Sequence, residues 1–285
     1  MTLPLLSVVI PTRNRAQLVC EAIESALSQR EGQVEVIVVD DGSTDGTVSS
    51  LAQHYGSKIQ LLRHSERQGP GAARNTGLRV ARGHLLAFLD DDDLWLPGKL
   101  DAELEVLDRF PDVEAVVSDS VVFVQGRATK QTFFERNGLL AATAGQPRHT
   151  DECRWLWTNS LNGVAMCSIT LRRSVLDHLD GKWFPEDLTS CEDWEFEMRV
   201  YHRCRVVALP KVYSWVRRID DGVRLGRAAP GKPPTREEEM GLLRDRLTVM
   251  ERSHWLSGLS ADLAAELKRY RDETSRKLAQ LAVDA

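Results

Sequence analysis

The sequence has few cysteines, and none of them are spaced for a metal or redox motif. Five cysteines occur in 285 residues, and no two form a Cys-x-x-Cys pair. This odd number and spacing disfavour both a structural zinc site and a disulfide framework, so a reducing compartment is the simplest environment. The Gly-x-Gly-x-x-Gly fingerprint after a strand and the P-loop lysine motif are also absent, which removes two common nucleotide-binding signatures.

Long apolar runs are missing as well. No segment approaches the roughly 20 apolar residues of a membrane span, and residues 1–7 are too short and too uncharged for a secretory signal. We therefore expect a cytoplasmic protein. One leucine pattern near the C-terminus permits peripheral contact with the inner face of a membrane, or homo-oligomerisation, although packing on its own domain is the ordinary alternative. It consists of Leu256, Leu259, Leu263 and Leu267, with Lys268, Arg269 and Arg271 beside them.

Positive charge is not in excess. The formal net charge is −5, and hydrophobic and charged residues make up 42% and 28% of the chain, as in an ordinary folded protein. A nucleic-acid partner is not expected, because it would leave a basic stripe. A local basic pocket for a polyanionic substrate remains compatible with this balance.

Strand and helix patterns alternate through the first part of the chain. Apolar, β-rich runs occupy residues 5–10, 34–39, 59–62 and 85–89. Helical spacing of apolar residues lies between them, at residues 16–29, 43–55 and 70–82, with Ser43 expected to cap the second helix. This alternation predicts an α/β fold with a mixed, mainly parallel sheet flanked by helices.

The second part of the chain is less regular. We expect a helix at residues 97–110, strands at 113–124, 164–171 and 206–209, and a helix at 193–202. Residues 126–151 are polar and predict a flexible loop or an acceptor-side segment, and residues 220–234 predict a mobile loop. A C-terminal helical extension follows, at residues 235–254 and 260–282.

Polar clusters fall directly after the predicted strands, at residues 11–15, 40–45 and 90–93. In open parallel sheets, ligands bind outside the carboxyl ends of strands. Four adjacent aspartates, Asp90 to Asp93, repel one another, and a divalent cation would relieve that repulsion. Mg²⁺ and Mn²⁺ favour such oxygen ligands together with substrate phosphates. The alternative is a solvated acidic turn at the start of the next helix.

Two further clusters have both a binding and a structural interpretation. The Asp41 carboxylate can accept a hydrogen bond from a nucleobase N–H or from a ribose hydroxyl. Alternatively, Asp41 belongs to a turn without a binding role. The glycine-rich residues 68–77 open a helix whose N-terminus suits phosphate, with Arg74 placed to meet a diphosphate or a base. A structural helix start explains the same pattern.

Taken together, residues 7–15 (SVVIPTRNR), 36–45 (VIVVDDGSTD), 69–77 (GPGAARNTG) and 83–95 (GHLLAFLDDDDLW) resemble the family 2 glycosyltransferases of the GT-A fold. The match in order and spacing covers roughly the first 125 residues. The resemblance implies a nucleotide-sugar-binding half at 1–125, an acceptor-binding half at 126–220, and a loop with C-terminal helices at 221–285. It also implies an inverting, metal-dependent transfer of a sugar, most often from a UDP-sugar, to an acceptor hydroxyl.

The resemblance assigns roles to individual residues. The aspartates of the family's DxD motif correspond to Asp90 and Asp92, with Asp92 as the main ligand of Mn²⁺ or Mg²⁺. Asp193, in residues 190–195 (SCEDWE), corresponds to the general base; acidic residues also open helices for electrostatic reasons alone. Nucleotide contacts are implied for Pro11, Thr12, Arg13, Asp41, Arg74 and Asp91.

The sequence departs from the family pattern at two places. Residues 212–218 (VYSWVRR) lack the histidine that is common on this loop, and Arg217 or Arg218 can supply the diphosphate contact instead. The QxxRW signature of processive synthases is absent, which favours transfer of a single sugar for glycan, polysaccharide or glycoconjugate synthesis. Two alternatives stay open, namely a nucleotidyltransferase and a catalytically inert protein that binds nucleotide-sugars.

Overall fold

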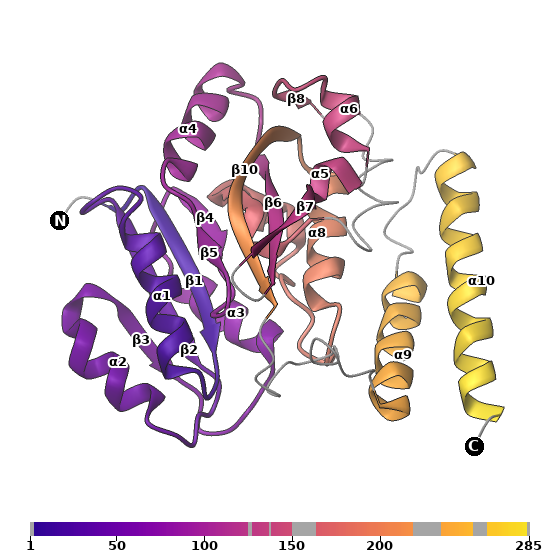
Figure 1. Cartoon of the computed structure of the whole chain (residues 1–285), viewed down its shortest axis with the longest axis horizontal. Helices are drawn as coiled ribbons and strands as arrows, with labels where there is room; N and C mark the ends of the chain where they lie inside the picture. The colour runs from indigo at the N-terminus through magenta and orange to yellow at the C-terminus, as the bar shows by residue number, and fades with distance from the viewer. Residues whose placement is uncertain are drawn as a thin grey trace.

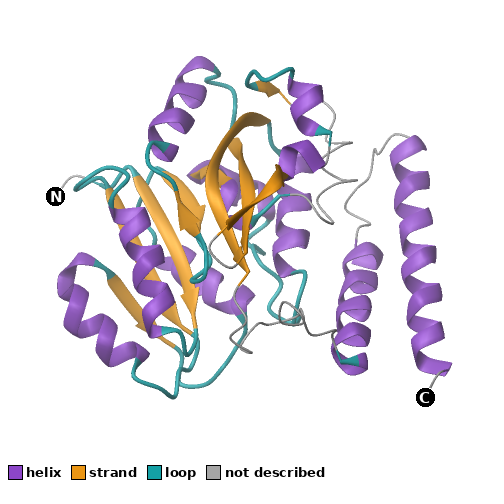
Figure 2. Cartoon of the chain, viewed as in Figure 1, coloured by secondary structure: helices purple, strands orange, loops and turns teal. Residues whose placement is uncertain are grey.

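The computed structural model describes residues 3–124, 127–136, 138–149, 164–218, 235–252 and 261–283. Within them lies a ten-stranded sheet in which the strands follow the order β3-β2-β1-β4-β9-β6-β10-β5, with β7 paired to β6 and β8 paired to β10. Helices flank the sheet, as Figures 1 and 2 show, and two further helices extend beyond it at one side.

The first half of the sheet is parallel and alternates with helices, as predicted. Its strands are β1 (Leu6–Thr12), β2 (Val34–Asp40), β3 (Gln60–Arg63) and β4 (Leu85–Phe88). β1 pairs in parallel with both β2 and β4, and β2 with β3. The helices between them are α1 (Ala16–Leu27), α2 (Thr47–Tyr55) and α3 (Pro70–Val80), with a 3-10 turn at Gly56–Lys58.

The second half of the sheet is mixed. β9 (Ile169–Arg172) runs antiparallel to both β4 and β6 (Ala115–Val124), and β6 runs parallel to β10 (Val206–Arg218). The short strands are β5 (Leu94–Trp95), β7 (Arg127–Thr132) and β8 (Arg148–His149). The remaining helices of this half are α4 (Lys99–Arg109), α5 (Phe133–Arg136), α6 (Leu139–Thr143) and α8 (Glu192–Arg203), with 3-10 turns at Met166–Ser168 and Arg173–Leu179.

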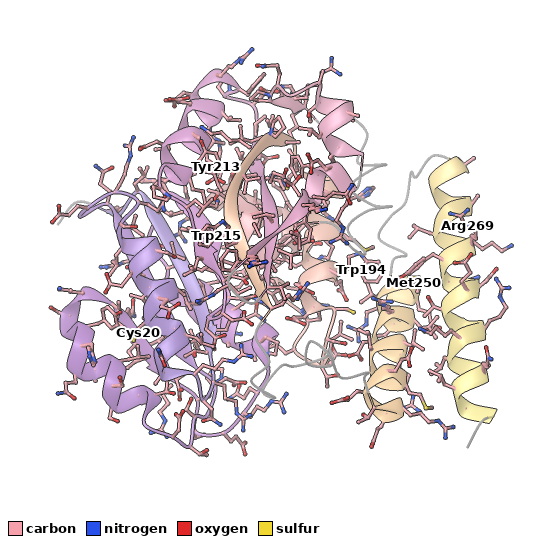
Figure 3. The ribbon with its side chains drawn as sticks, viewed as in Figure 1. Cys20, Trp194, Tyr213, Trp215, Met250 and Arg269 are labelled. Atoms are coloured by element: carbon pink, nitrogen blue, oxygen red, sulfur yellow. The ribbon has the colours of Figure 1, made fainter. Side chains whose placement is uncertain are left out.

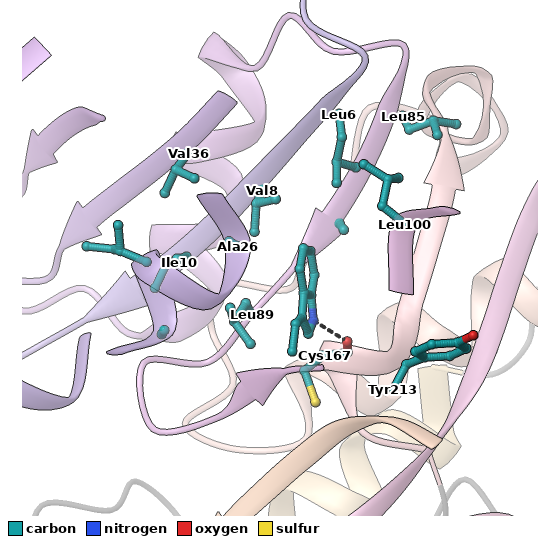
Figure 4. Packing of buried hydrophobic residues seen from close by; sticks show 14 of the residues in the cluster. Leu6, Val8, Ile10, Ala26, Val36, Leu85, Leu89, Leu100, Cys167 and Tyr213 are labelled. Carbon is teal, nitrogen blue, oxygen red and sulfur yellow. Dashed lines mark hydrogen bonds between the residues drawn. The ribbon is translucent and has the colours of Figure 1, made fainter. Parts of the chain in front are cut away.

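The sheet separates two hydrophobic cores. In β1, Val8 and Ile10 belong to one core, which also contains side chains of α1 and α4, whereas Val9 belongs to the other, which contains side chains of α3 and α8. Figure 4 shows part of the first core, in which Val8 and Ile10 lie near Val36 of β2 and Ala26 of α1, and Leu6 lies beside Leu100 of α4. Because successive strand side chains alternate between faces, a strand covered on both sides is apolar throughout. This explains the unbroken apolar runs of the sequence.

The C-terminal extension consists of α9 (Arg236–Arg252) and α10 (Ala261–Val283). α9 packs against α8, and α10 lies on the far side of α9 (Figure 1). Leu267 packs toward the cluster between these helices, which agrees with packing on the chain's own domain. Leu256, Leu259 and the side chain of Leu263 lie outside the described residues. Peripheral membrane contact and oligomerisation therefore stay predictions.

Among the described residues, none of the helices combines the length and the apolar character that crossing a bilayer requires.

Two local predictions were wrong, and a third described a strand that is longer than predicted. Ser43 does not cap α2, which begins four residues later; Asp45 Oδ1 accepts from the backbone and hydroxyl of Thr47 instead, at 2.9 and 2.6 Å. Residues 126–151 are not a loop throughout, because β7, α5, α6 and β8 lie within them. The strand predicted at residues 206–209 continues to Arg218, past an irregularity after Leu209. The loop predicted at 220–234 lies outside the described residues.

Candidate active site

The carboxyl ends of the parallel strands bring the predicted polar residues to one edge of the sheet. β1, β2 and β4 point the same way, so the residues that follow them meet. Thr12 joins the clusters directly: its carbonyl accepts from Asp41 N at 2.8 Å, and its hydroxyl donates to Asp91 Oδ2 at 2.7 Å. Asp41 and the acidic run, residues Asp90 to Asp93, therefore both contact Thr12.

The acidic run forms a tight turn that is mostly buried. Arg15 contacts two of its aspartates, with Nη1 2.8 Å from Asp91 Oδ1 and 3.4 Å from Asp92 Oδ2. Burial, together with the neighbouring charge of Asp92, raises the pKa of Asp91 to about 6 although Arg15 opposes it. Arg15 adjoins the predicted nucleotide residues and was missed by the sequence interpretation. An arginine next to a strand end carries no signal for which carboxylate it meets.

Asp93 and Arg217 close the far side of the turn. Burial raises the pKa of Asp93 well above its usual range, and the charges of Asp92 and Asp90 add to this effect. Arg217 donates its backbone N–H to Asp93 Oδ1 at 3.0 Å, and its guanidinium binds the carbonyl of Asp92 and the carboxylate of Glu21. The strand β10 thus ties Arg217 to the acidic turn, while Arg218 lies half-buried at the end of the same strand.

Asp41 organises the segment that leads into α3. Its Oδ1 accepts from Gln68 N at 2.8 Å and lies 2.8 Å from His64 Nδ1, and its Oδ2 accepts from Gly69 N at 2.9 Å. Only 4% of the residue is exposed. The predicted base contact remains untested, and the structure adds that Asp41 holds its own loop in shape. His64 was not found from sequence, because an isolated histidine does not reveal its partner.

Arg74 connects the residues that follow β4 with α8. Its Nη2 donates to Asp90 Oδ1 at 2.7 Å and its Nη1 to Glu192 Oε1 at 2.6 Å, while its guanidinium lies over the ring of Phe184. Burial works against the charged form of Arg74, but the charges of Asp90 and Glu192 outweigh it and raise its pKa. The nucleotide contact predicted for Arg74 stays a prediction; in the structure Arg74 bridges two carboxylates 102 positions apart in the chain.

The glycine-rich entry to α3 serves close packing. A Cβ on Gly71 would lie 2.5 Å from the carbonyl oxygen of Pro185 and 3.4 Å from Glu192 Cγ. Asn75 strengthens this contact: its amide donates to Phe184 O and Glu186 Oε1 at 2.9 and 2.8 Å. The start of α3 is therefore fixed against the segment before α8, which favours the structural interpretation of these glycines.

Asp193 lies in the first turn of α8, next to Glu192. It is half-buried, and its Oδ1 accepts from Trp194 N at 2.8 Å. Burial and the charge of Asp193 raise the pKa of Glu192 to about 7, against the effect of Arg74. Burial and the same charge raise the pKa of Glu197, one turn further along, well above its usual range. Asp193 thus lies near the cation Arg74 and near two carboxyl groups, Glu192 and Glu197, whose neutral forms are favoured.

Other predicted residues are placed but not linked to the network. Pro11 and Arg13 are half-buried at the end of β1, and Arg13 Nε is buried without a hydrogen-bond partner among the described residues. Trp194 packs in the cluster between α8 and α9 (Figure 3).

The acidic turn suits a divalent cation held jointly with a diphosphate. Among the described residues, three or more metal-binding side chains do not gather at one point. The side chain of Asp90 is 36% exposed, while Asp92 is 9% exposed. One or two carboxylates completed by phosphate oxygens is the donor set that Mg²⁺ commonly takes. The residues fit such a cation in the presence of donor.

Comparison with known proteins identifies the family. A model described as glycosyl transferase family 2 matches residues 7–179. This is more than half of the chain, and the chain belongs to glycosyl transferase family 2. The enzyme class and the family predicted from the four sequence clusters are thereby confirmed.

Curated relatives agree with this family and are mostly longer. The succinoglycan biosynthesis protein ExoO of Rhizobium meliloti is 38% identical over 127 residues, which are 45% of this chain and 36% of that protein. The UDP-Glc:alpha-D-GlcNAc-diphosphoundecaprenol beta-1,3-glucosyltransferase WfgD of Escherichia coli is 35% identical over 103 residues, 36% of this chain and 41% of that one. An uncharacterized glycosyltransferase of Rickettsia bellii is 29% identical over 70% of this chain, which spans only 27% of that relative.

Solved structures confirm the fold. S. aureus TarS, residues 1–349 with UDP-GlcNAc, has a TM-score of 0.65 and 21% identity, covering 97% of this chain and 71% of that one. The mannosyltransferase PcManGT of Pyrobaculum calidifontis, with GDP-Man and Mn²⁺, has a TM-score of 0.62 and 20% identity over 100% of this chain and 77% of that one. The GT-A fold predicted from sequence is therefore correct. The three-part division of the chain stays a prediction.

Proposed function

We propose that this chain transfers one sugar from a nucleotide-sugar of the UDP type to an acceptor hydroxyl, with inversion at the anomeric carbon and with a divalent cation. The observation that carries the proposal is the continuous network from Asp41 through Thr12 and Asp91 to Asp90, Arg74 and the start of α8. It reaches Glu192, the neighbour of Asp193 in the first turn of α8, and so links the implied donor residues to the turn that carries the implied general base.

On the donor side, the nucleotide would lie along the ends of β1, β2 and β4. Pro11, Thr12 and Arg13 would line its pocket, with Asp41 near the base and Asp91 near the ribose. The buried Nε of Arg13, which lacks a partner in the described part of the chain, leaves a donor group for such a ligand. TarS was solved with UDP-GlcNAc and PcManGT with GDP-Man. The ligands of these two structures are therefore nucleotide-sugars of the UDP and the GDP type.

Asp92, with Asp90, would hold Mn²⁺ or Mg²⁺ against the diphosphate. A bound cation supplies neutralisation of the negative charge that grows on the departing diphosphate. The fixed cations Arg74 and Arg217 lie beside the same turn, and Arg218 follows on β10. Preorganised positive charge stabilises developing negative charge without reorganisation during the reaction.

Asp193 would act as the general base that accepts the proton of the attacking acceptor hydroxyl. This role requires an ionised carboxylate, and Arg74 lies close enough to interact electrostatically with it. Glu192 is the weaker candidate, because burial and the Arg74 contact commit its side chain to the protein. General-base help contributes about 10²–10⁴-fold to a rate.

A donor-turnover assay separates this function from its alternatives. The purified chain is incubated with UDP-sugars and Mn²⁺, and release of UDP is measured with and without chelator. Release that chelator abolishes supports the transferase. Pyrophosphate from a nucleoside triphosphate would instead identify a nucleotidyltransferase, and binding without turnover in the presence of varied sugar acceptors would identify an inert binding protein.

Two variants test the assigned roles. Asp193→Asn should lower kcat by about 10²–10⁴-fold and leave the donor KM nearly unchanged, since it removes the base and no donor contact. Asp92→Ala should abolish the increase in melting temperature that UDP-sugar and Mn²⁺ produce together. Asp108→Asn, an exposed aspartate on α4, is the matched control and should behave as the parent. Near-normal turnover of Asp193→Asn would remove it from the base role.

A further inference from the structure

The segment before α8 is anchored at four consecutive residues to the C-terminal helix α9. Arg252 binds the carboxylate of Asp187, with Nη1 3.0 Å from Oδ1. Leu188 lies in the cluster between the two helices. Thr189 and Ser190 bind Asp245. The next residues are Cys191, Glu192 and Asp193, so α9 holds the chain directly before the implied base.

Asp245 is the most highly connected of these anchors. A single oxygen, Oδ2, accepts from Thr189 Oγ1 at 2.8 Å, from Ser190 N at 2.9 Å and from Ser190 Oγ at 2.9 Å. Hydrogen bonds to a charged acceptor are shorter and stronger than those between neutral groups. The carboxylate therefore holds the side chains of both residues that precede the helix cap, and also the backbone of Ser190.

The start of α8 needs such support. Cys191, its cap residue, has a φ of +64°, a left-handed conformation that is costly for a non-glycine residue. The Cys191 side chain makes no capping hydrogen bond within the described residues. Three acidic residues occupy the first turn, Glu192, Asp193 and Glu195. A strained, uncapped helix start persists only where its surroundings determine it, and α9 supplies part of those surroundings, together with Arg74, which binds Glu192.

The helices also share a hydrophobic cluster. Trp194 and Met198 of α8 pack with Val249 and Met250 of α9, and Figure 3 labels Trp194 and Met250 close to each other across this contact. The cluster lies apart from the two cores beside the sheet. It sets the position of α9 so that Asp245 reaches the segment before α8.

We propose that Asp245 is a positioning residue, which holds the start of α8 so that the Asp193 carboxylate meets the acceptor hydroxyl. The inference rests on the proposed role of Asp193 as base. The physical reason is that a displacement of about 1 Å at a reacting group can cost on the order of 10²-fold in rate. Among the described residues, the side chain of Asp245 hydrogen-bonds to Thr189 and Ser190, neither of which belongs to the acidic turn.

The test is a double-mutant cycle in the full chain with UDP-sugar and Mn²⁺. Asp245→Ala should lower kcat by about 10- to 100-fold and change the donor KM by less than about twofold. In the Asp193→Asn background, Asp245→Ala should lower kcat hardly any further. The reason is that Asp245 affects the rate by positioning the Asp193 carboxylate, which this background lacks. Asp245→Asn keeps an acceptor oxygen and should recover most of the rate. Glu251→Ala, an exposed acid on the same helix, is the matched control.

The outcomes distinguish the inference from the function on which it rests. Low turnover of Asp193→Asn with normal turnover of Asp245→Ala overturns the positioning role and leaves the base in place. Normal turnover of Asp193→Asn overturns both. A fully additive loss in the double variant shows that Asp245 acts on overall folding. If Asp245→Ala melts at a much lower temperature, Ser190→Ala replaces it; removing one hydroxyl contact should still lower kcat by about fivefold without a change in KM.

Discussion

Glu192 illustrates how a single buried carboxyl group couples the site to pH. It is 5% exposed and bound to Arg74, yet burial outweighs that contact and raises its pKa to about 7. In the unfolded chain the pKa returns to about 4.5. Through Glu192 the folded protein binds more protons than the unfolded chain between these two values, so the contribution of this group to stability falls as the pH rises from about 4.5 to about 7.

The prediction is a difference in pH dependence between two proteins. In metal-free buffer, the parent chain should lose several degrees of melting temperature between about pH 4.5 and pH 7, the range between the two pKa values of Glu192. Glu192→Gln has no proton to lose, so its decline should be shallower, although the buried Asp91, Asp93 and Glu197, whose pKa values are also raised, still contribute. Thermal melts at each pH measure the slopes. Equal slopes in the two proteins would contradict the assignment, and Glu251→Gln should keep the parent slope.

At the scale of single residues, the sequence predicted which residues carry functional groups but not which residues they contact. Thr12, Asp91 and Arg74 were assigned from motifs, and the structure brings them into one network. Arg15, His64 and Asp245 were missed, because each is defined by a carboxylate or amide far away in the chain. Only tertiary packing decides which of many arginines, histidines and aspartates meet.

At the scale of elements, α3 depends on a close approach to β1. A Cβ on Gly77 would lie 2.4 Å from Val9 Cγ1, and valine is too stiff at χ1 to move aside easily. The helix α3 therefore packs directly on the strand that carries Thr12. By contrast, a Cβ on Gly241, inside α9, meets nothing within 4 Å.

These two glycines predict opposite effects of the same substitution. Gly77→Ala should destabilise the protein by about 1–3 kcal/mol through overpacking, which exceeds the gain in helix propensity. Gly241→Ala should stabilise it by about 0.5–1 kcal/mol, since only the propensity gain applies. Chemical denaturation of both variants measures the free energies of unfolding. A stabilising Gly77→Ala would show that α3 can move away from β1.

Elements were predicted well where the pattern repeats and poorly where it breaks. The alternating strands and helices up to Arg109 follow hydrophobic periodicity, which packing on both faces of the sheet imposes. Pro210 and Lys211 interrupt the apolar run after Leu209, so the sequence indicated an end; β10 continues because its pairing with β6 resumes beyond an irregularity. The polar strand β7 was read as a loop, since its residues are mostly exposed and lack an apolar face.

At the scale of the whole molecule, the described regions differ in how deeply their side chains are buried. β1, β2 and β4 lie inside the sheet between two cores and are almost fully buried. The helix α10 packs on α9, and Thr274 alone is buried among its described side chains. Segments with few buried apolar contacts open at lower free energy than the core.

Hydrogen exchange tests this order and its link to the site. Backbone amides of β1, β2 and β4 should exchange last, those of α9 earlier, and those of α10 first. Addition of UDP-sugar with Mn²⁺ should slow exchange at the strand ends, in residues 12–15, 40–43 and 90–93, and at the start of α8, while α10 stays unchanged because it contributes nothing to the donor network. Mass spectrometry of timed, quenched samples measures each region. Protection of α10 equal to that of β1, or donor-induced protection confined to α10, would contradict the arrangement described for the two ends of the molecule.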